Sequence, residues 1–281
     1  MIQQNGGKAR RVGLNHVGDI DYLRKFYECN RRFPLFQQVL LETRTDCNGH
    51  CSFCPHAFNK KPLHIMKWNC FTTIIDQLVE IGYNGRVALM VSNEPLLENR
   101  LVKMVRYAKH RSPRLFLDVT SNGRLLTLEK VDELFDAGLD NLNVNDYRSD
   151  RDKYPERMTG NIARVAEAYG NNPKLTIQFR RTDERLPNYG GNIPQVLNVP
   201  DLGFCNFPFR KVVVAYNGDV LLCCNDFMYN TEFGNIMQKR IDQCWNDPRL
   251  DAIRFVLLEG HRVGLCGRCN DVQDYNVFGV E

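Results

Sequence analysis

The stretch Thr45-Asp-Cys-Asn-Gly-His-Cys-Ser-Phe-Cys-Pro55 carries three cysteines, Cys47, Cys51 and Cys54, separated by gaps of three and two residues. With this spacing, one short loop can place three thiolates around a single inorganic cluster. A cluster that only transfers electrons is normally held by four cysteines, and no fourth cysteine lies nearby. The spacing therefore indicates a cluster with one iron left open for a small ligand.

A zinc site and a disulfide framework are the alternatives to a cluster for this cysteine triplet. A zinc site needs four ligands, and His50 or His56 could add one, although neither is spaced like the second half of a zinc motif. A disulfide framework is disfavoured because the chain has 11 cysteines, an odd number, and residues 1–10 lack the apolar core of a secretion signal. We therefore expect a cytoplasmic protein that holds an inorganic cluster.

Length and composition set the frame for this expectation. The chain of 281 residues suffices for one full domain and a small appendage, and 43% apolar with 25% charged residues is ordinary for a folded protein. The net charge of +4 is too small and too dispersed to argue for nucleic acid. No apolar stretch approaches the roughly 20 residues of a membrane span. We expect neither nucleic-acid nor membrane partners.

Short apolar runs alternate with amphipathic runs through the middle of the chain. Such alternation predicts parallel strands joined by right-handed crossovers. We therefore expect an α/β fold, a partial (β/α)5–6 barrel of the TIM type, with its active face at the carboxyl ends of the strands. The predicted strands are 36–44, 86–91, 114–120, 141–145 and 174–179, and the predicted helices cover about 71–79, 97–105, 128–135 and 162–169.

Polar segments follow the predicted strands at the point where each strand ends. The cysteine loop follows the first strand, Ser92-Asn-Glu-Pro95 the second, Thr120-Ser-Asn-Gly123 the third and Asn145-Asp146 the fourth. Any one of these segments alone can be read as a strand-terminating turn. Because the strand ends of such a barrel meet at one rim, together they predict a binding site there.

The cysteine triplet, with its preceding strand and Phe53 in the second gap, resembles the radical S-adenosylmethionine (SAM) superfamily. The resemblance implies that Cys47, Cys51 and Cys54 ligate a [4Fe–4S] cluster whose open iron binds the methionine part of SAM. An electron from the cluster then cleaves SAM, and the resulting 5′-deoxyadenosyl radical takes hydrogen from a C–H bond. An external reductant, such as flavodoxin or ferredoxin, is implied as a partner.

The same resemblance assigns further residues to SAM. Glu94 matches the carboxylate of the Gly-Gly-Glu-Pro segment that receives the methionine ammonium in this superfamily. Ser92 and Asn93 replace the two glycines, which is a departure from the family pattern. The remaining SAM contacts that the resemblance implies are Phe53, Ser121, Asn122 and Asn145.

Four of the cysteines in the last third of the chain form a second spaced set. Cys205 is followed by 12 residues, Gly218, four residues and Cys223, and a Cys266-Gly-Arg-Cys269 knuckle comes later. Residues 211–222 predict a hairpin, and Asn217-Gly218 is typical of a type I′ turn. A helical run over 241–257 then leads to the knuckle. Taken alone, this pattern suits a zinc ribbon as well as an iron–sulfur site.

Attached to a radical SAM barrel, this pattern resembles the auxiliary-cluster domain called SPASM and its short form, twitch. The resemblance implies one further [4Fe–4S] cluster, fully ligated by four thiolates, in a small α+β domain of a hairpin plus a helix. We therefore divide the chain into an N-terminal extension at 1–35, a barrel at 36–198 and a twitch domain at 199–281. The implied ligands are Cys205, Cys223, Cys266 and Cys269.

Within the superfamily, the chain resembles the dehydrogenases that oxidise an alcohol of an aminocyclitol. Such enzymes take hydrogen from the carbinol carbon, remove the hydroxyl proton with a base and pass the last electron to the auxiliary cluster. Tyr189 stands where this family has an arginine that is proposed to contact the hydroxyl, and we name it a catalytic candidate. The matching stretches are Asn93–Leu97, Tyr189–Gly191, Cys223–Phe227, Gly234–Ile236, Asp247 and Glu259–Arg262, and the nearby alternatives to Tyr189 are Arg180, Arg181, Asp183 and Arg185.

Three alternatives to oxidation of a small aminated or polyhydroxylated metabolite stay open. The first is epimerisation, in which Cys244 or Cys224 returns a hydrogen atom. The second is maturation of a ribosomal peptide, for which no leader-binding segment is recognised, although residues 1–35 are unassigned. The third is a zinc-bearing interaction module. Apart from the Cys244 and Cys224 hypothesis, we expect Cys29, Cys70, Cys224 and Cys244 to be small buried apolar residues.

Overall fold

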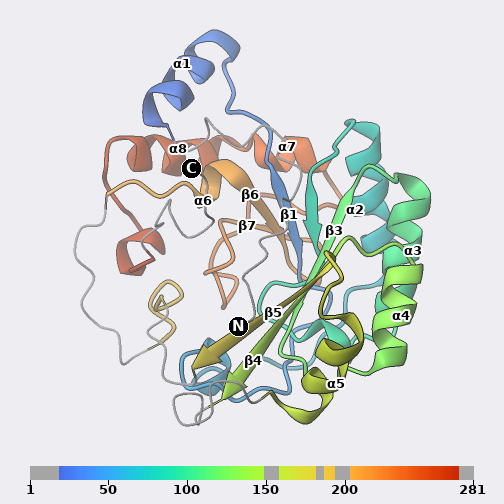
Figure 1. The fold of residues 1–281 in the computed structure, drawn as a ribbon. Helices are drawn as coiled ribbons and strands as arrows, with labels where there is room; N and C mark the ends of the chain where they lie inside the picture. Colours follow the sequence, from blue (N-terminus) through green and yellow to red (C-terminus); the bar gives the residue numbers. More distant parts are fainter. Residues whose placement is uncertain (1–18, 149–157, 182–186, 194–202, 272–281) are drawn as a thin grey trace.

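The computed structural model describes residues 19–148, 158–181, 187–193 and 203–271. Its strands form one seven-stranded sheet in the order β5-β4-β3-β2-β1-β6-β7 (Figure 1). Neighbouring strands are parallel except for the antiparallel pair of β6 and β7. The strands are β1 Gln38–Leu41, β2 Arg86–Ala88, β3 Phe116–Ser121, β4 Asn141–Arg148, β5 Leu175–Arg181, β6 Lys211–Val214 and β7 Val220–Leu221.

The predicted alternation of strands and helices is confirmed. Helices follow the first four strands in turn, and α2, α3 and α4 lie along one face of the sheet (Figure 1). The helices are α1 Ile20–Asn30, α2 Trp68–Glu80, α3 Leu101–Arg111, α4 Leu128–Asp136, α5 Gly160–Tyr169, α6 Phe207–Arg210, α7 Ile241–Trp245 and α8 Pro248–Leu258, with 3₁₀ turns η1 Pro55–Ala57, η2 Pro95–Leu97 and η3 Cys266–Arg268.

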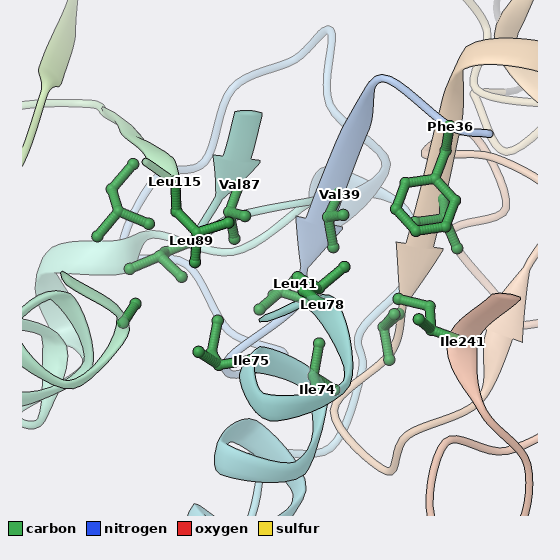
Figure 2. Close-up of a cluster of buried hydrophobic side chains, with 14 of the residues drawn as sticks. Phe36, Val39, Leu41, Ile74, Ile75, Leu78, Val87, Leu89, Leu115 and Ile241 are labelled. Carbon is green, nitrogen blue, oxygen red and sulfur yellow. The ribbon is translucent and has the colours of Figure 1, made fainter. Parts of the chain in front are cut away.

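Alternating strand residues face two separate apolar clusters. Val39 and Val87 point toward α2, where Ile74 and Leu78 pack against them (Figure 2). Their neighbour Leu40 faces the other way and belongs to a smaller cluster on the inner face of the sheet. This period of two turns one set of side chains toward the helices and the other set toward the inner face of the sheet. The smaller cluster contains Leu40, Ala88, Val213, Ala215 and Leu221, with Val91, Cys224 and Tyr229 packed against it.

The C-terminal hairpin continues the sheet of the barrel, because β6 pairs in parallel with β1 from Gln38 to Leu41. The predicted hairpin is confirmed, but the type I′ turn is wrong. Gly218 has a φ of 93°, whereas the φ of Asn217 is not positive. Gly218 N donates to Ala215 O at 2.9 Å and Ala215 N donates to Asp219 O at 2.9 Å. These bonds define a three-residue loop with glycine in the left-handed position.

One helix was not predicted from the sequence. Asp19 caps α1, and Leu23 of this helix is fully buried. Tyr27 packs edge-on against Phe255 of α8 at 4.8 Å, so α1 covers the C-terminal helix. The helical run predicted near residue 241 is two helices, because Pro248 starts a new one. Across the described ranges, none of the helices is both long and apolar enough to cross a bilayer.

The boundary that we predicted between 198 and 199 lies outside the described residues, as do the predicted base candidates Asp183 and Arg185. Cys29, at the end of α1, is exposed, so its predicted burial is wrong. The exposed position follows from the helix, whose only buried residue is Leu23. The prediction for Cys70, which is buried in α2, is confirmed.

Candidate active site

The three-cysteine loop begins where β1 ends. Thr43 O accepts from Met66 N at 2.9 Å and Thr45 N donates to His64 O at 3.1 Å, so a returning segment braces the start of the loop. Inside the loop, Gly49 N donates to Cys47 Sγ at 3.3 Å. A Cβ atom at Gly49 would lie 3.3 Å from that sulfur and 3.7 Å from Cys51 Sγ. Glycine therefore keeps the space between the thiols free, as a shared inorganic group requires.

The loop thiols are half-buried, and their environment disfavours a bare thiolate. Burial raises the pKa of Cys47 and Cys51, and raises that of Cys54 to about 11. The Arg124 guanidinium opposes this effect on the pKa of Cys51, and its Nη1 donates to Asn48 O at 2.9 Å. Because metal ligation needs thiolates, a bound cation supplies the charge that this loop lacks. The donor set and the open space both fit a cluster.

Glu94 joins the ends of β2 and β3. Its side chain is only 2% exposed, and Oε1 accepts from Ser121 Oγ at 2.7 Å and from Leu96 N at 2.9 Å. Oε2 accepts from Asn122 N at 2.8 Å. Burial raises the pKa of Glu94, and these donors oppose that rise. The structure thus brings together three residues that were predicted as SAM contacts.

Asn122 also connects this group to the cysteine loop. Its Nδ2 donates to Asn48 Oδ1 at 2.7 Å and lies 3.8 Å from Cys47 Sγ. The carboxyl ends of three strands are therefore linked through side chains that reach the first thiol. This is the common rim that parallel strands predict.

The two residues that replace the family glycines both make structural contacts. The Asn93 side chain accepts from Val91 N at 3.0 Å and donates to Thr43 Oγ1 at 3.4 Å. His56 Nε2 donates to the Ser92 carbonyl at 2.7 Å, which binds the cysteine loop to the segment after β2. The Asn93 side chain therefore adds contacts that glycine could not make, whereas the bond to the Ser92 carbonyl does not depend on the serine side chain.

Asn145 lies inside β4 rather than after it, because β4 pairs with β5 as far as Arg148. Its Oδ1 is buried and lacks a hydrogen-bond partner among the described residues, and so does the Oδ1 of Asn143. Both lie on the strand face opposite the buried Leu142 and Val144. An orphaned amide oxygen is an acceptor that a ligand can satisfy.

Phe53 lies across from the inner face of β4. Its ring centroid is 5.3 Å from that of Tyr147, with the two planes tilted by 41°. Tyr147 is on the same strand face as Asn145, two residues away. The cysteine loop therefore contacts β4 on the strand face that carries the orphaned oxygens.

The four later cysteines line one pocket and are all buried, at 7–8% exposure. Burial raises the pKa of Cys205 to about 11 and that of Cys266 to about 12. Within the described parts of the chain, no group of three or more His, Cys, Asp and Glu side chains is arranged to hold a single metal ion. Four thiols around a shared pocket instead fit a larger iron–sulfur cluster in which each thiolate binds its own iron.

Tyr189 occupies a strained turn that is attached to the four-cysteine site. Its φ is 48°, an uncommon value for a residue with a Cβ. Asn188 N donates to Asn270 Oδ1 at 2.6 Å, and Asn270 N donates back to Asn188 Oδ1 at 3.1 Å. Burial raises the pKa of Tyr189, and negative charge on Cys54 and Cys224 raises it further. The hydroxyl therefore stays protonated at neutral pH, and the turn that carries it is joined to Asn270, the residue after Cys269.

The structure separates the two candidate hydrogen donors. Cys244 is fully buried in α7, and its neighbour Trp245 packs against Phe36 at the start of β1. That is the end of the strand opposite the cysteine loop, so Cys244 is not brought together with the other site residues. Cys224 packs against the inner-face cluster and directly follows Cys223 of the four-cysteine set.

A buried ion pair beside the cysteine loop was missed from the sequence. Lys61 Nζ lies 3.1 Å from Glu42 Oε1, and Tyr229 OH donates to Glu42 Oε2 at 2.6 Å. The Lys61 ammonium is also 4.0 Å from the ring centroids of Phe227 and Tyr229. This network joins the end of β1 to the C-terminal region. In the sequence, Lys61 looks like an ordinary loop lysine, and no pattern predicts that its side chain is buried.

Comparisons with known proteins agree with this geometry. A model of the radical SAM superfamily matches residues 41–174, and a model of the SPASM iron–sulfur cluster-binding domain matches residues 205–270. The S-adenosyl-L-methionine-dependent 2-deoxy-scyllo-inosamine dehydrogenase of Niallia circulans is 29% identical over 244 residues, which cover 85% of this chain and 94% of the relative. The predicted resemblance to aminocyclitol dehydrogenases is confirmed.

Solved structures show the same fold. The crystal structure of BtrN in complex with AdoMet and 2-DOIA matches with a TM-score of 0.75 and 26% identity, over 85% of this chain and 95% of that one. SuiB of Streptococcus suis bound to S-adenosylmethionine matches with a TM-score of 0.52 and 13% identity, over 83% and 71% of the chains, which shows the fold alone. The chain belongs to the radical SAM superfamily, with a C-terminal SPASM domain, and its cofactors are SAM, a SAM-binding [4Fe–4S] cluster and auxiliary iron–sulfur.

Proposed function

We propose that this enzyme oxidises an alcohol group of a small polyhydroxylated or aminated metabolite, of the aminocyclitol or sugar type. The observation that supports this best is the position of the turn that carries Tyr189. On one side Asn188 exchanges hydrogen bonds with Asn270, the residue after Cys269. On the other side Asn192 O accepts from Nδ2 of Asn59, in the segment after the cysteine loop, at 3.0 Å. A substrate beside Tyr189 is therefore near the radical-generating loop and near the four-cysteine site at once. The likeness to an aminocyclitol dehydrogenase supports the same substrate class.

Two sets of thiols hold the clusters in this proposal. When bound, SAM and its cluster supply a 5′-deoxyadenosyl radical that takes hydrogen from carbon, and the auxiliary cluster supplies an acceptor for the remaining electron. An external reductant such as flavodoxin or ferredoxin supplies the starting electron. The loop ligands are Cys47, Cys51 and Cys54, and the auxiliary ligands are Cys205, Cys223, Cys266 and Cys269.

Glu94 receives the methionine ammonium of SAM. Its carboxylate is oriented by Ser121 and by the backbone of Asn122, so its position is set before the ligand arrives. Asn145 offers its unpartnered Oδ1 from the opposite wall, and Phe53 supplies an apolar surface beside it. A buried carboxylate with a raised pKa gains most from a cationic partner, because the partner offsets the cost of burial.

Tyr189 binds the substrate oxygen as a hydrogen-bond donor. Its raised pKa makes it a poor acceptor of the substrate proton at neutral pH, so its role is orientation rather than proton removal. The turn that carries it is attached to the auxiliary site through Asn188, whose Nδ2 donates to Arg268 O at 2.8 Å. Substrate placement and the auxiliary site are thereby coupled. The arginine of the related dehydrogenases is replaced by a neutral donor here.

Radical epimerisation is a second candidate, favoured by the position of Cys224. This thiol packs beside the inner-face cluster and directly follows the auxiliary ligand Cys223, which suits a donor of hydrogen to a product radical. The position of Cys244 at the opposite end of β1 offers no such support. Cys224→Ala separates the two reactions. An epimerase would lose turnover while SAM cleavage continues, whereas an alcohol dehydrogenase would keep its product.

An anaerobic assay tests the proposed function. Reduced, reconstituted protein is mixed with SAM and candidate aminocyclitols or sugars, and 5′-deoxyadenosine and product mass are followed by mass spectrometry. A product lighter by two hydrogens supports oxidation. An unchanged mass with deuterium incorporated from solvent supports epimerisation and contradicts the dehydrogenase proposal. Colourless protein with zinc and no acid-labile sulfide would contradict both.

A further inference from the structure

Arg262 connects both halves of the four-cysteine site. Its Nε donates to Gly203 O at 2.8 Å, in the segment that leads into Cys205. Its Nη1 donates to Cys269 O at 3.0 Å, and Nη2 donates to Asp271 O at 3.2 Å. One guanidinium thus binds the carbonyl of Gly203 and those of Cys269 and Asp271, which lie 66 and 68 residues further along the chain.

Arg262 also brings a fixed charge to the pocket. Of the described residues that line it, Arg262 is the one cation. The guanidinium lines the same pocket as all four thiols, so its charge lies beside the ligand set. Arginine remains charged at any pH at which the protein is folded. The charge therefore persists whether the site is protonated, ligated or reduced.

We propose that Arg262 is a positioning residue that raises the reduction potential of the auxiliary cluster and so makes it an acceptor for the substrate electron. This inference rests on the proposed function, in which the four cysteines hold that cluster. Oxidation of an alcohol carbon to a carbonyl removes one hydrogen atom, which the 5′-deoxyadenosyl radical takes, then one proton, which passes to solvent, and one electron, which passes to the auxiliary cluster. A reduced cluster carries one more negative charge, which a nearby buried cation stabilises.

The neighbouring Asn225 has a different part in the site. Its Nδ2 donates to Cys269 Sγ at 3.5 Å and to Asp271 Oδ2 at 2.9 Å. The amide therefore keeps the Asp271 carboxylate engaged beside the ligand set, while the Arg262 guanidinium binds the Asp271 main chain. Arg262 can then act on the thiols without forming an ion pair with that carboxylate.

Redox titration of the auxiliary cluster, followed by electron paramagnetic resonance (EPR), tests the inference. All variants carry Cys51→Ala, so that the auxiliary cluster alone is observed. Arg262→Gln should retain iron and sulfide but shift the midpoint potential to more negative values. Arg249→Gln removes the same charge from an exposed position on α8, where Arg249 pairs with Asp247, and should leave the potential unchanged. An unchanged potential in Arg262→Gln overturns the proposal.

Arg262→Lys keeps the inference testable if the Gln variant cannot hold its cluster. Lysine retains the charge and loses the forked geometry, so we expect a retained cluster whose potential lies close to that of the parent. Loss of iron from the Lys variant as well would show that Arg262 acts in assembly alone, which overturns the proposal. Absence of a cluster in the Cys51→Ala parent would instead contradict the proposed function.

Discussion

The two cysteine sets differ in how the chain builds them. Cys47, Cys51 and Cys54 come from one short loop, are half-buried and lie beside the polar group of Glu94 and Asn122. The four later cysteines come from three separate segments, are at most 8% exposed and share their pocket with Arg262. The first arrangement leaves room for a ligand to come and go, and the second shields a group from exchange. Cysteine therefore forms a site open to a ligand in the first set and a shielded site in the second.

Of the changes that distinguish the two cysteine sets, removal of a ligand from the three-cysteine loop should have the largest effect on activity. Cys51→Ala should abolish 5′-deoxyadenosine formation and lower the iron content from about eight to about four per chain, because one of two four-iron clusters is lost. Iron analysis and a SAM-cleavage assay measure both. Cys29→Ala, at an exposed thiol, is the matched control and should behave as the parent. Full SAM cleavage in Cys51→Ala would contradict the ligand assignment.

Glu94→Gln should weaken SAM binding without loss of either cluster. The amide cannot pair with the methionine ammonium, and the loss of a charged hydrogen bond corresponds to roughly 10- to 100-fold in Kd. Binding is measured by equilibrium dialysis of reconstituted protein with labelled SAM. Glu129→Gln, in the first turn of α4, serves as the control. Equal affinity in the Glu94 and Glu129 variants would show that Glu94 has no such role.

Tyr189→Phe should lower product formation without stopping SAM cleavage. Loss of one hydrogen bond to the substrate oxygen should lower kcat/KM for product about 10-fold while SAM is still cleaved. The ratio of 5′-deoxyadenosine to product, measured in one reaction, should therefore rise. Tyr107→Phe, whose hydroxyl donates to Asp76 on the outer helices, should leave the ratio unchanged. An unchanged ratio in Tyr189→Phe would count against the placement of substrate at this turn.

The cluster-free protein should lose stability at alkaline pH. Burial raises the pKa of Cys54 from 9.0 to about 11, so the folded state favours the thiol. The stabilising contribution is complete below about pH 9 and is lost as pH rises toward 11. Urea unfolding should show a decrease on the order of 1 kcal/mol for this thiol near pH 10. Cys54→Ala should flatten that slope and Cys29→Ala should not, and identical slopes would refute the account.

Local features of the site could be predicted from the sequence. The cysteine gaps, Glu94 after the second strand and Ser121 after the third are readable because each depends on residues close together in the chain. The sheet followed from apolar periodicity, since alternating residues of β1 and β2 pack on α2. The predicted type I′ turn at Asn217 was wrong because loop length, and not the dipeptide alone, decides the turn type.

Contacts between distant segments could not be predicted. The Glu42, Lys61 and Tyr229 network joins three places in the chain, and each residue alone looks like ordinary surface. Arg262 belongs to a stretch that the family resemblance marked, yet its contacts with both halves of the pocket depend on tertiary structure. The helix α1 was missed although Asp19 is a typical N-cap and Ile20, Leu23 and Tyr27 recur at helical spacing, whereas its packing on α8 depends on tertiary structure.

The response of each cluster to SAM tests the central claim most directly. EPR spectra of reduced Cys51→Ala and Cys223→Ala proteins are recorded with and without SAM. In Cys223→Ala the remaining cluster is held by the open three-cysteine loop, so its spectrum should change when SAM is added. In Cys51→Ala the remaining cluster is held by four buried thiols, so its spectrum should not change. A SAM-dependent change in Cys51→Ala, or none in Cys223→Ala, would contradict the division between an open and a closed site.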